Sequence, residues 1–215
     1  MENKVLSKSF LWMALGLLLT FGTGYVVSIN ENMLVNIFSG VGYIIFIIIE
    51  FILVIVLSAR IMKMKPTMAK ICFLLYAFVS GLTFSSIFVV FEMKSIMFIF
   101  LIAAALFGVM AFLGAKTKVD LTKIGTYFMI ALVASIIVSL LNVLIFKSPG
   151  LEMGISIVVL LLFIGVTAYD VQKILAISDS GIPEDNAAIY GALELYLDFI
   201  NIFIRLLQLF GKGRD

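Results

Sequence analysis

The sequence predicts an all-α integral membrane protein with seven transmembrane helices. Of its 215 residues, 63% are hydrophobic and 13% are charged, whereas a typical globular domain is about half apolar and about a quarter charged. The apolar residues come in long blocks, as expected for transmembrane helices, which need about 20 such residues each. A transmembrane β-barrel is excluded, because its strands would alternate apolar and polar residues.

Seven apolar blocks are separated by short polar links. We predict spans at residues 10–29, 35–59, 71–91, 95–115, 121–146, 153–174 and 189–210. The polar run Asn30-Glu31-Asn32 follows the first span, Pro66 interrupts the basic link after the second, and Ser148-Pro149-Gly150 makes a turn after the fifth. Because the links are short, we expect one compact membrane domain covering residues 1–215.

Small and basic residues predict how the spans are arranged. In the fourth span Ala104, Gly108, Ala111 and Ala115 recur at helical spacing, which predicts a helix-packing face. With a cytoplasmic N-terminus, ten of the 15 basic residues fall on the cytoplasmic side: Lys4, Lys8, Arg60, Lys63, Lys65, Lys70, Lys116, Lys118, Lys123 and Lys173. The positive-inside rule therefore predicts that the N-terminus is cytoplasmic and the C-terminus is outside.

The composition excludes several kinds of chemistry. The chain has no His and a single Cys, which removes His-dependent nucleophilic catalysis, His-ligated zinc or haem and thiolate metal cages. We therefore predict no cofactor. The net charge of +2 and the lack of a long basic run give no sign of nucleic-acid binding. A group that titrates near neutral pH must then be a perturbed carboxylate.

Polar residues form a stripe along the last span. In a helix Glu194, Asp198, Asn201, Arg205 and Gln208 fall within an arc of about 80°. The rest of that helix is apolar, so in a bilayer the stripe must face protein or a wet cavity. We take Glu194, Asn201 and Arg205 as candidates for an ion pathway.

Three further polar residues lie in or beside the other spans. Glu50 is near the middle of span 35–59 and is another pathway candidate, and Asp170 is near the end of span 153–174. Asp170 and Asp198 lie on consecutive antiparallel spans, where two close carboxylates would share a proton and titrate as a pair. Arg60, at the membrane border, could reach either aspartate as a latch, or it could anchor the helix to lipid headgroups.

The chain resembles the Bax-inhibitor family of transmembrane proteins, in its compact bacterial form. The resemblance covers essentially the whole chain, and its most specific part pairs Tyr169-Asp170-Val171-Gln172 with the run LYLDFINIF at residues 195–203. Supporting matches are YAFVSGLT at residues 76–83, Gly114-Ala115-Lys116 with Asp120, and Glu50 with Arg60.

The resemblance implies both a fold and a function. The last helix would be central and wrapped by the other six. The protein would be a pH-sensitive calcium leak in which Asp170 and Asp198 form the sensor and Arg60 is the latch partner. Its partners would be the lipid bilayer, calcium ions and protons. Because calcium prefers oxygen ligands, Asp170, Asp198 and Glu194 are candidates for transient calcium contacts. The short loops favour a bacterial cytoplasmic membrane.

Two residues depart from the family pattern. Gln208 stands where the family usually has an arginine, and Arg205 lies one turn earlier. Glu194 stands at a position that is commonly uncharged. It could raise the proton affinity of the aspartate pair, add a calcium ligand or neutralise Arg205.

Three other functions use the same residues. A proton-coupled calcium antiporter is the main alternative to a leak, although we find neither an inverted repeat nor a broken helix. An intramembrane aspartyl protease would need a Gly-x-Gly-Asp segment, whereas Leu195, Tyr196 and Leu197 precede Asp198. A non-conducting regulator of other membrane proteins would leave the intramembrane acids unexplained. We therefore expect a protein that is not an enzyme.

Overall fold

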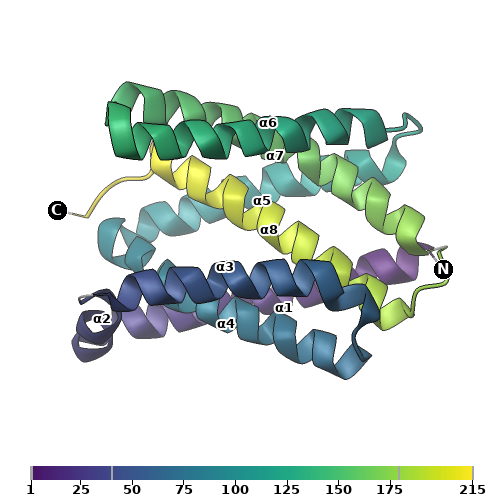
Figure 1. Cartoon of the computed structure of the whole chain (residues 1–215), viewed down its shortest axis with the longest axis horizontal. Coiled ribbons are helices and arrows are strands. Elements are labelled where there is room, and N and C mark those ends of the chain that lie inside the picture. Colours follow the sequence, from purple (N-terminus) through teal and green to yellow (C-terminus); the bar gives the residue numbers. More distant parts are fainter. Residues whose placement is uncertain (1, 40, 179, 215) are drawn as a thin grey trace. The chain divides into compact units, whose positions relative to one another are not determined.

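The computed structural model describes residues 2–39, 41–178 and 180–214, without the side chains of residues 2 and 3. It confirms the predicted class, because seven of its helices are long and apolar enough to cross a membrane. Figure 1 shows the helices. In order they are α1 (Glu2–Ser28), α2 (Glu31–Phe38), α3 (Gly42–Arg60), the 3-10 turn η1 (Ile61–Lys63), α4 (Pro66–Val90), α5 (Met93–Lys116), α6 (Thr122–Leu141), the π-helical turn η2 (Asn142–Phe146), α7 (Pro149–Ser178) and α8 (Glu184–Phe210).

The prediction of one helix over residues 35–59 was wrong at its start. Residues 31–38 form the separate short helix α2, and the spanning helix α3 begins only at Gly42. Asn30 starts α2 by accepting a hydrogen bond from the Met33 N–H at 3.1 Å, as a helix-capping asparagine does. Hydropathy could not reveal this break, because the residues on both sides of it are apolar. Several other spans start earlier than predicted, because their first turns are polar.

The helices form two compact units. Unit 1 contains Met1–Met93, Ile174–Tyr196 and Gly213–Asp215, and unit 2 contains Lys94–Lys173 and Leu197–Lys212. The N-terminal half of helix α8 therefore belongs to unit 1 and its C-terminal half belongs to unit 2. The prediction of a single domain over residues 1–215 stays a prediction.

Helix α8 is the most buried of the seven spans. In its most apolar window 72% of the residues are buried, against 11–50% in the other spans. In unit 1 the ring of Tyr196 packs edge-on against Phe73 and Tyr76 of α4. In unit 2 the ring of Phe199 packs in the same way against Phe100 and Phe107 of α5. Each half of α8 thus has an aromatic anchor in its own unit, and the wrapping of α8 by the other six helices stays a prediction.

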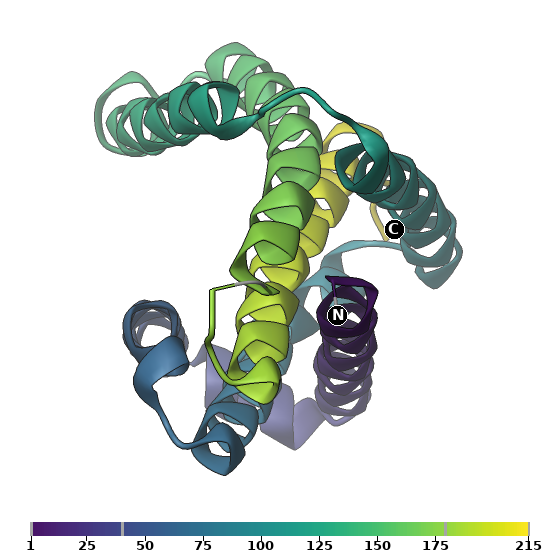
Figure 2. The ribbon, with the colours of Figure 1, turned by 90° about the vertical axis from the view of Figure 1, so that its right-hand side faces the viewer.

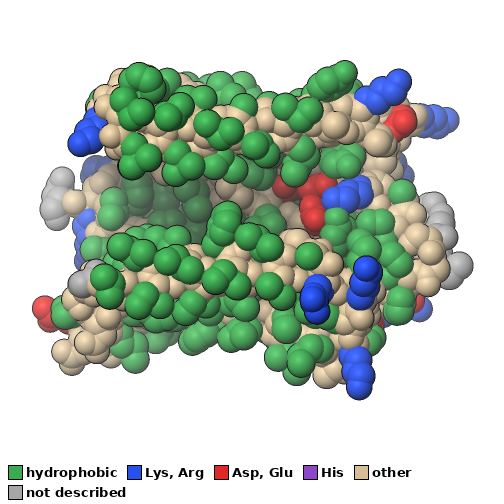
Figure 3. All heavy atoms as spheres, in the orientation of Figure 1, with side chains coloured by type: hydrophobic (Ala, Val, Ile, Leu, Met, Phe, Trp, Pro, Cys, Tyr) green, Lys and Arg blue, Asp and Glu red, His purple; other side chains and the backbone are tan. Residues whose placement is uncertain are grey.

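Lipid-facing surfaces lie on the other helices. Hydrophobic side chains cover α3 and α6 on the face shown in Figure 3. Exposed apolar residues of α3 include Ile44, Ile48 and Phe51. Such a surface would be costly in water, and it matches the hydrocarbon of a bilayer.

Helix α5 packs through a different glycine from the predicted one. Gly108 is exposed, and a Cβ added there would have no neighbour within 4 Å, whereas Gly114 is buried against Ala168 of α7. Ala111 is buried, as predicted for the packing face. The buried face of α5 runs through Ile96, Ile99, Ala103, Phe107, Ala111 and Gly114. The spacing of the small residues correctly predicted a helix. It predicted a packing face that includes the exposed Gly108 instead of the buried Gly114.

The link between α6 and α7 is closed by one asparagine. Asn142 donates from Nδ2 to the Ser148 carbonyl at 3.1 Å and accepts from the Ser148 N–H at 3.0 Å. Between them Lys147 lies in the left-handed region, with φ 47° and ψ 38°. A residue with a Cβ pays about 1–2 kcal/mol for this conformation.

We expect Lys147→Gly to raise the free energy of unfolding by up to about 1 kcal/mol, because glycine adopts positive φ without a steric cost. The thermal midpoint of the detergent-solubilised protein measures this effect. Lys94→Gly, within helix α5, is the control and should lower stability by up to about 1 kcal/mol. A loss of stability in Lys147→Gly as large as in Lys94→Gly would contradict the expectation.

Candidate functional site

Glu50 is held by two hydroxyl groups of the neighbouring helix. It lies half-buried on α3 and accepts hydrogen bonds from Ser80 Oγ at 2.5 Å and Thr83 Oγ1 at 2.7 Å, both on α4. Ser80 and Thr83 are three residues apart, so they project from one face of the helix. A carboxylate inside a membrane needs such donors, because unpaired charge there is costly. The sequence indicated Glu50 but not its partners.

A second set of hydroxyl groups lies beside Glu50 in unit 1. The Thr20 hydroxyl donates to the Ala77 carbonyl at 2.8 Å, so it accepts from the Tyr196 hydroxyl, which lies 2.7 Å away. Two groups of polar contacts, Glu50 with Ser80 and Thr83 and Thr20 with Tyr196, thus meet on α4 and link it to α1, α3 and α8 within unit 1.

Asp170 and Asp198 are both buried in unit 2. Their exposed fractions are 4% and 2%. Lys173 is a basic neighbour of Asp170, with its Nζ 3.8 Å from Asp170 Oδ1 and 5.9 Å from the centroid of the Tyr169 ring. Sequence reasoning counted Lys173 only as a topology signal. Its spacing of three residues from Asp170 on a helix was the signal for this pairing.

The contact between α7 and α8 shows how far apart the two aspartates lie along the helix axes. The two helices run antiparallel (Figures 1 and 2). Arg205 Nη1 donates to Ser156 Oγ at 3.3 Å, and Ser156 Oγ donates to Gln208 Oε1 at 3.4 Å. Counted from these contacts, Asp170 and Asp198 differ in level by four to seven residues, or about 6–10 Å along the helix axes. They lie within two helical turns of each other, and direct sharing of a proton stays a prediction.

The C-terminal part of the polar stripe is bonded within unit 2. Arg205 Nη1 also donates to Gln208 Oε1 at 2.9 Å, so Arg205 contacts the glutamine that stands where the family usually has an arginine. Asn201 donates to the Leu197 carbonyl of its own helix at 2.8 Å. Beside Gln208 lies a cavity of about 190 Å³, lined by Pro149, Glu152, Met153, Ser156, Gln208 and Leu209.

Arg60 and Glu194 belong to unit 1. Arg60 is exposed at the end of α3, and Glu194 is half-buried on α8, one turn before Asp198. The predicted latch between Arg60 and the aspartates of unit 2 stays a prediction. Within the described ranges, no three acidic or cysteine side chains gather closely enough to hold a metal ion. Transient calcium contacts of Asp170, Asp198 and Glu194 therefore stay a prediction as well.

The glutamine of the Tyr-Asp-x-Gln motif holds the link between α5 and α6. Gln172 accepts from the Leu121 N–H at 2.8 Å and donates to the Val119 carbonyl at 2.9 Å. Asp120, between them, accepts from the Thr122 N–H at 2.9 Å, and its hydrogen bonds with the Thr122 side chain and backbone hold its pKa below the usual value. The motif thus ties this link to the segment that carries Asp170.

A clamp that the sequence did not predict surrounds the N-terminus of α8 in unit 1. We call it the α8 clamp, and its residues are Lys8, Lys70, Glu184, Asp185 and Asn186. Lys8 Nζ lies 2.6 Å from Glu184 Oε1, and Lys70 Nζ lies 2.6 Å from Asp185 Oδ2. Asn186 is fully buried and donates from Nδ2 to the carbonyls of Ile61 at 2.6 Å and Met64 at 2.8 Å.

The two kinds of contact in the α8 clamp differ in strength. The ion pairs are partly exposed, with side-chain exposures of 30–39%, and such pairs contribute little, about 0–1 kcal/mol each. Asn186 is sealed from water, so loss of its amide would leave two carbonyls without donors. This residue anchors the turn that follows Arg60 to the start of α8.

Buried acids, a half-buried arginine and hydroxyl networks within seven spans define a polytopic helical membrane protein with a polar interior. Comparison with known proteins identifies its family. Residues 2–215 match the family described as "Inhibitor of apoptosis-promoting Bax1". The chain belongs to this Bax-inhibitor family, which confirms the resemblance drawn from the motifs.

Similar proteins occur in several bacteria. The chain is 37% identical to the Escherichia coli K12 protein called "Inner membrane protein YbhL", over 94% of this chain and 89% of that protein. It is 39% identical to an uncharacterized protein of Borreliella burgdorferi, over 100% of this chain and 94% of that one. It is 35% identical to an uncharacterized protein of Deinococcus radiodurans, over 98% and 90% of the two chains.

Proposed function

We propose that the protein is a pH-sensitive calcium leak channel in which Asp170 and Asp198 are the sensor and Arg60 is the latch. The observation that carries this proposal is the burial of both aspartates inside a chain without histidine. A carboxylate in such a place changes its interactions sharply when it gains or loses a proton. The membership of the protein in the Bax-inhibitor family supports the proposal of a calcium leak.

Calcium would follow the oxygen-bearing side chains of the polar interior. Carboxylate oxygens attract calcium and repel anions, and Glu194, Asp198 and Asp170 supply them. Glu50 would be a further calcium-binding position in unit 1, where the hydroxyl groups of Ser80 and Thr83 orient its carboxylate. Asn201 and Arg205 lie on the same face of α8, where they would change the electrostatic potential along the ion pathway.

A proton-coupled calcium antiporter is the second candidate. The contact between Asp170 and Lys173 favours it, because a buried acid with a basic neighbour is an arrangement that proton relays use. An antiporter would exchange protons for calcium through the same carboxylates. The two candidates differ in whether calcium can move against its gradient.

Proteoliposomes loaded with a calcium dye separate these candidates. A leak passes calcium down its gradient without a proton gradient and never accumulates it. An antiporter accumulates calcium when a proton gradient opposes the calcium gradient. If neither protocol moves calcium above the level of protein-free vesicles, the transport proposal is wrong, and binding to other membrane proteins should be tested instead.

We also propose a cytoplasmic N-terminus in a bacterial cytoplasmic membrane. The α8 clamp supports part of this topology, because it joins Lys8 of α1 and Lys70 of α4 to the start of α8. These three chain segments are predicted to lie on the same side. The relative called an inner membrane protein supports the location.

A further inference from the structure

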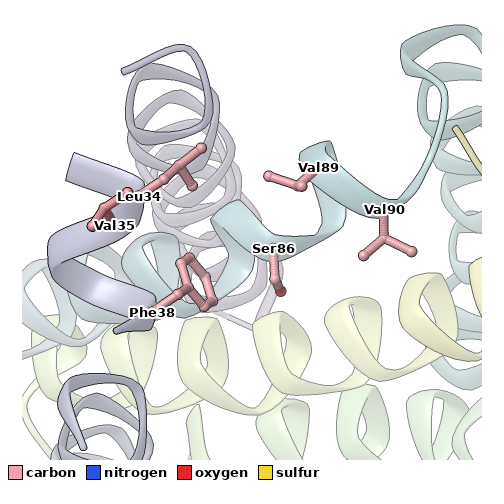
Figure 4. A pocket seen from close by; sticks show the side chains of 6 residues that line it. All are labelled: Leu34, Val35, Phe38, Ser86, Val89 and Val90. Carbon is pink, nitrogen blue, oxygen red and sulfur yellow. The ribbon is translucent and has the colours of Figure 1, made fainter. Parts of the chain in front are cut away.

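An apolar groove lies between α2 and α4 in unit 1, and neither the acids nor the clamp involves it. Its volume is about 380 Å³, and its lining residues are Leu34, Val35, Phe38, Ser86, Val89 and Val90. Figure 4 shows Leu34 of α2 and Val89 of α4 pointing toward one another across the groove. Five of its six lining residues are apolar, and the sixth is Ser86.

The one hydroxyl group in the groove is already satisfied. Ser86 Oγ donates to the Thr83 carbonyl of its own helix at 3.0 Å. One hydroxyl oxygen is too few to hold a cation, an anion or a water cluster, since each needs several polar partners. The groove suits a purely hydrocarbon occupant.

The position of the groove indicates where that occupant comes from. Val35, Val89 and Val90 are about half exposed, so the groove opens onto the apolar outer surface of the spans. Polar residues mark the nearby ends of these helices: Asn30 and Glu31 at the start of α2, and Glu92 after α4. The groove is thus continuous with the lipid-facing surface, close to the level of the lipid headgroups.

We propose that this groove binds one acyl chain of a membrane lipid. The side chains that line an unfilled apolar void lose dispersion contacts. In a bilayer, lipid hydrocarbon surrounds the spans and can restore these contacts. The short helix α2 forms one wall, so the bound chain would hold α2 against α4. The other wall includes Ser86, one turn from Thr83, which donates to Glu50 at 2.7 Å. Occupancy of the groove would therefore stabilise the segment that orients Glu50.

The single tryptophan of the chain makes a direct test practical. Trp12→Phe gives a tryptophan-free background, into which Phe38→Trp places a reporter inside the groove. Phe98→Trp is the matched control, because Phe98 is 65% exposed and lies five residues from the start of α5, much as Ser86 lies four residues from the end of α4. Both reporters are reconstituted in phosphatidylcholine vesicles with increasing fractions of the same lipid carrying brominated acyl chains.

We expect the Phe38→Trp reporter to be quenched at a lower fraction of brominated lipid than the Phe98→Trp control. Val89→Phe, which fills the groove from its exposed edge, should abolish that difference and leave the control unchanged. Equal quenching curves for the two reporters would overturn the proposal, because the groove would then meet only bulk lipid. An unquenched Phe38→Trp reporter would also overturn it, because protein, such as a second copy of the chain, would then cover the groove.

Discussion

Gly114→Ala is expected to lower the free energy of unfolding by about 1–3 kcal/mol, the usual cost of overpacking a tight contact. A Cβ at position 114 would lie 2.7 Å from the Cα of Ala168 and closer still to its carbonyl oxygen. These are backbone atoms of a helix, so they cannot rotate away, and α5 and α7 must move apart. Ala168 is two residues from Asp170, so the same change should disturb this proposed sensor residue. The thermal midpoint of the purified protein in detergent measures the loss.

The control for this change is on the same helix. Gly108 is exposed, and a Cβ there would have nothing within 4 Å. Gly108→Ala should therefore leave stability unchanged or raise it by up to about 1 kcal/mol, because alanine favours helix over glycine. Equal stabilities of the Gly114→Ala and Gly108→Ala proteins would show that α5 and α7 are not in close contact.

Asn186→Ala is expected to lower the free energy of unfolding by about 2–4 kcal/mol, since an unsatisfied buried polar group costs about 1–3 kcal/mol. The substitution removes the one amide that donates to both the Ile61 and Met64 carbonyls. The turn between α3 and α4, which follows Arg60, would then lose its anchor on α8. Protection of this turn from proteolysis or hydrogen exchange reports the loss locally.

A second substitution separates hydrogen bonding from packing. Asn186→Asp keeps the shape of the side chain but replaces the donating amide with an accepting carboxylate opposite two carbonyls. We expect it to be at least as destabilising as Asn186→Ala at neutral pH, because the buried carboxylate must either stay charged opposite two carbonyls or take up a proton well above its ordinary pKa. Full stability of the Asn186→Asp protein would mean that the amide donors are unimportant.

The sequence was sufficient for the fold class but not for the break in the second span. Long apolar blocks distinguish a helical membrane protein whatever their detailed packing. The gap between α2 and α3 lies inside one such block, where only the short run Ser39-Gly40-Val41-Gly42 interrupts the apolar residues on either side. Likewise Gly108 and Gly114 differ only in the face of α5 that they occupy, and a face is set by neighbouring helices.

The acids of the candidate site were recognised, but their hydroxyl partners were not. Intramembrane carboxylates are rare enough to attract attention by themselves. Serine and threonine in helices usually bond to their own backbone, as Ser85, Ser135 and Thr167 do here. Nothing in the sequence distinguishes these residues from Ser80 and Thr83, which reach Glu50 only because α3 and α4 pack together. Long-range pairing of this kind becomes visible only in the folded chain.

The most direct test of the calcium leak is calcium influx into dye-loaded proteoliposomes between about pH 5 and pH 8. The wild-type protein is compared with Asp198→Asn, which keeps the shape of the side chain but cannot ionise. We expect the wild type to pass calcium at a rate that depends on pH, and the variant to change both the rate and its pH dependence. An Asp198→Asn protein with the wild-type rate and pH profile would contradict the sensor role of Asp198. A wild-type protein that passes no calcium at any of these pH values would contradict the leak itself.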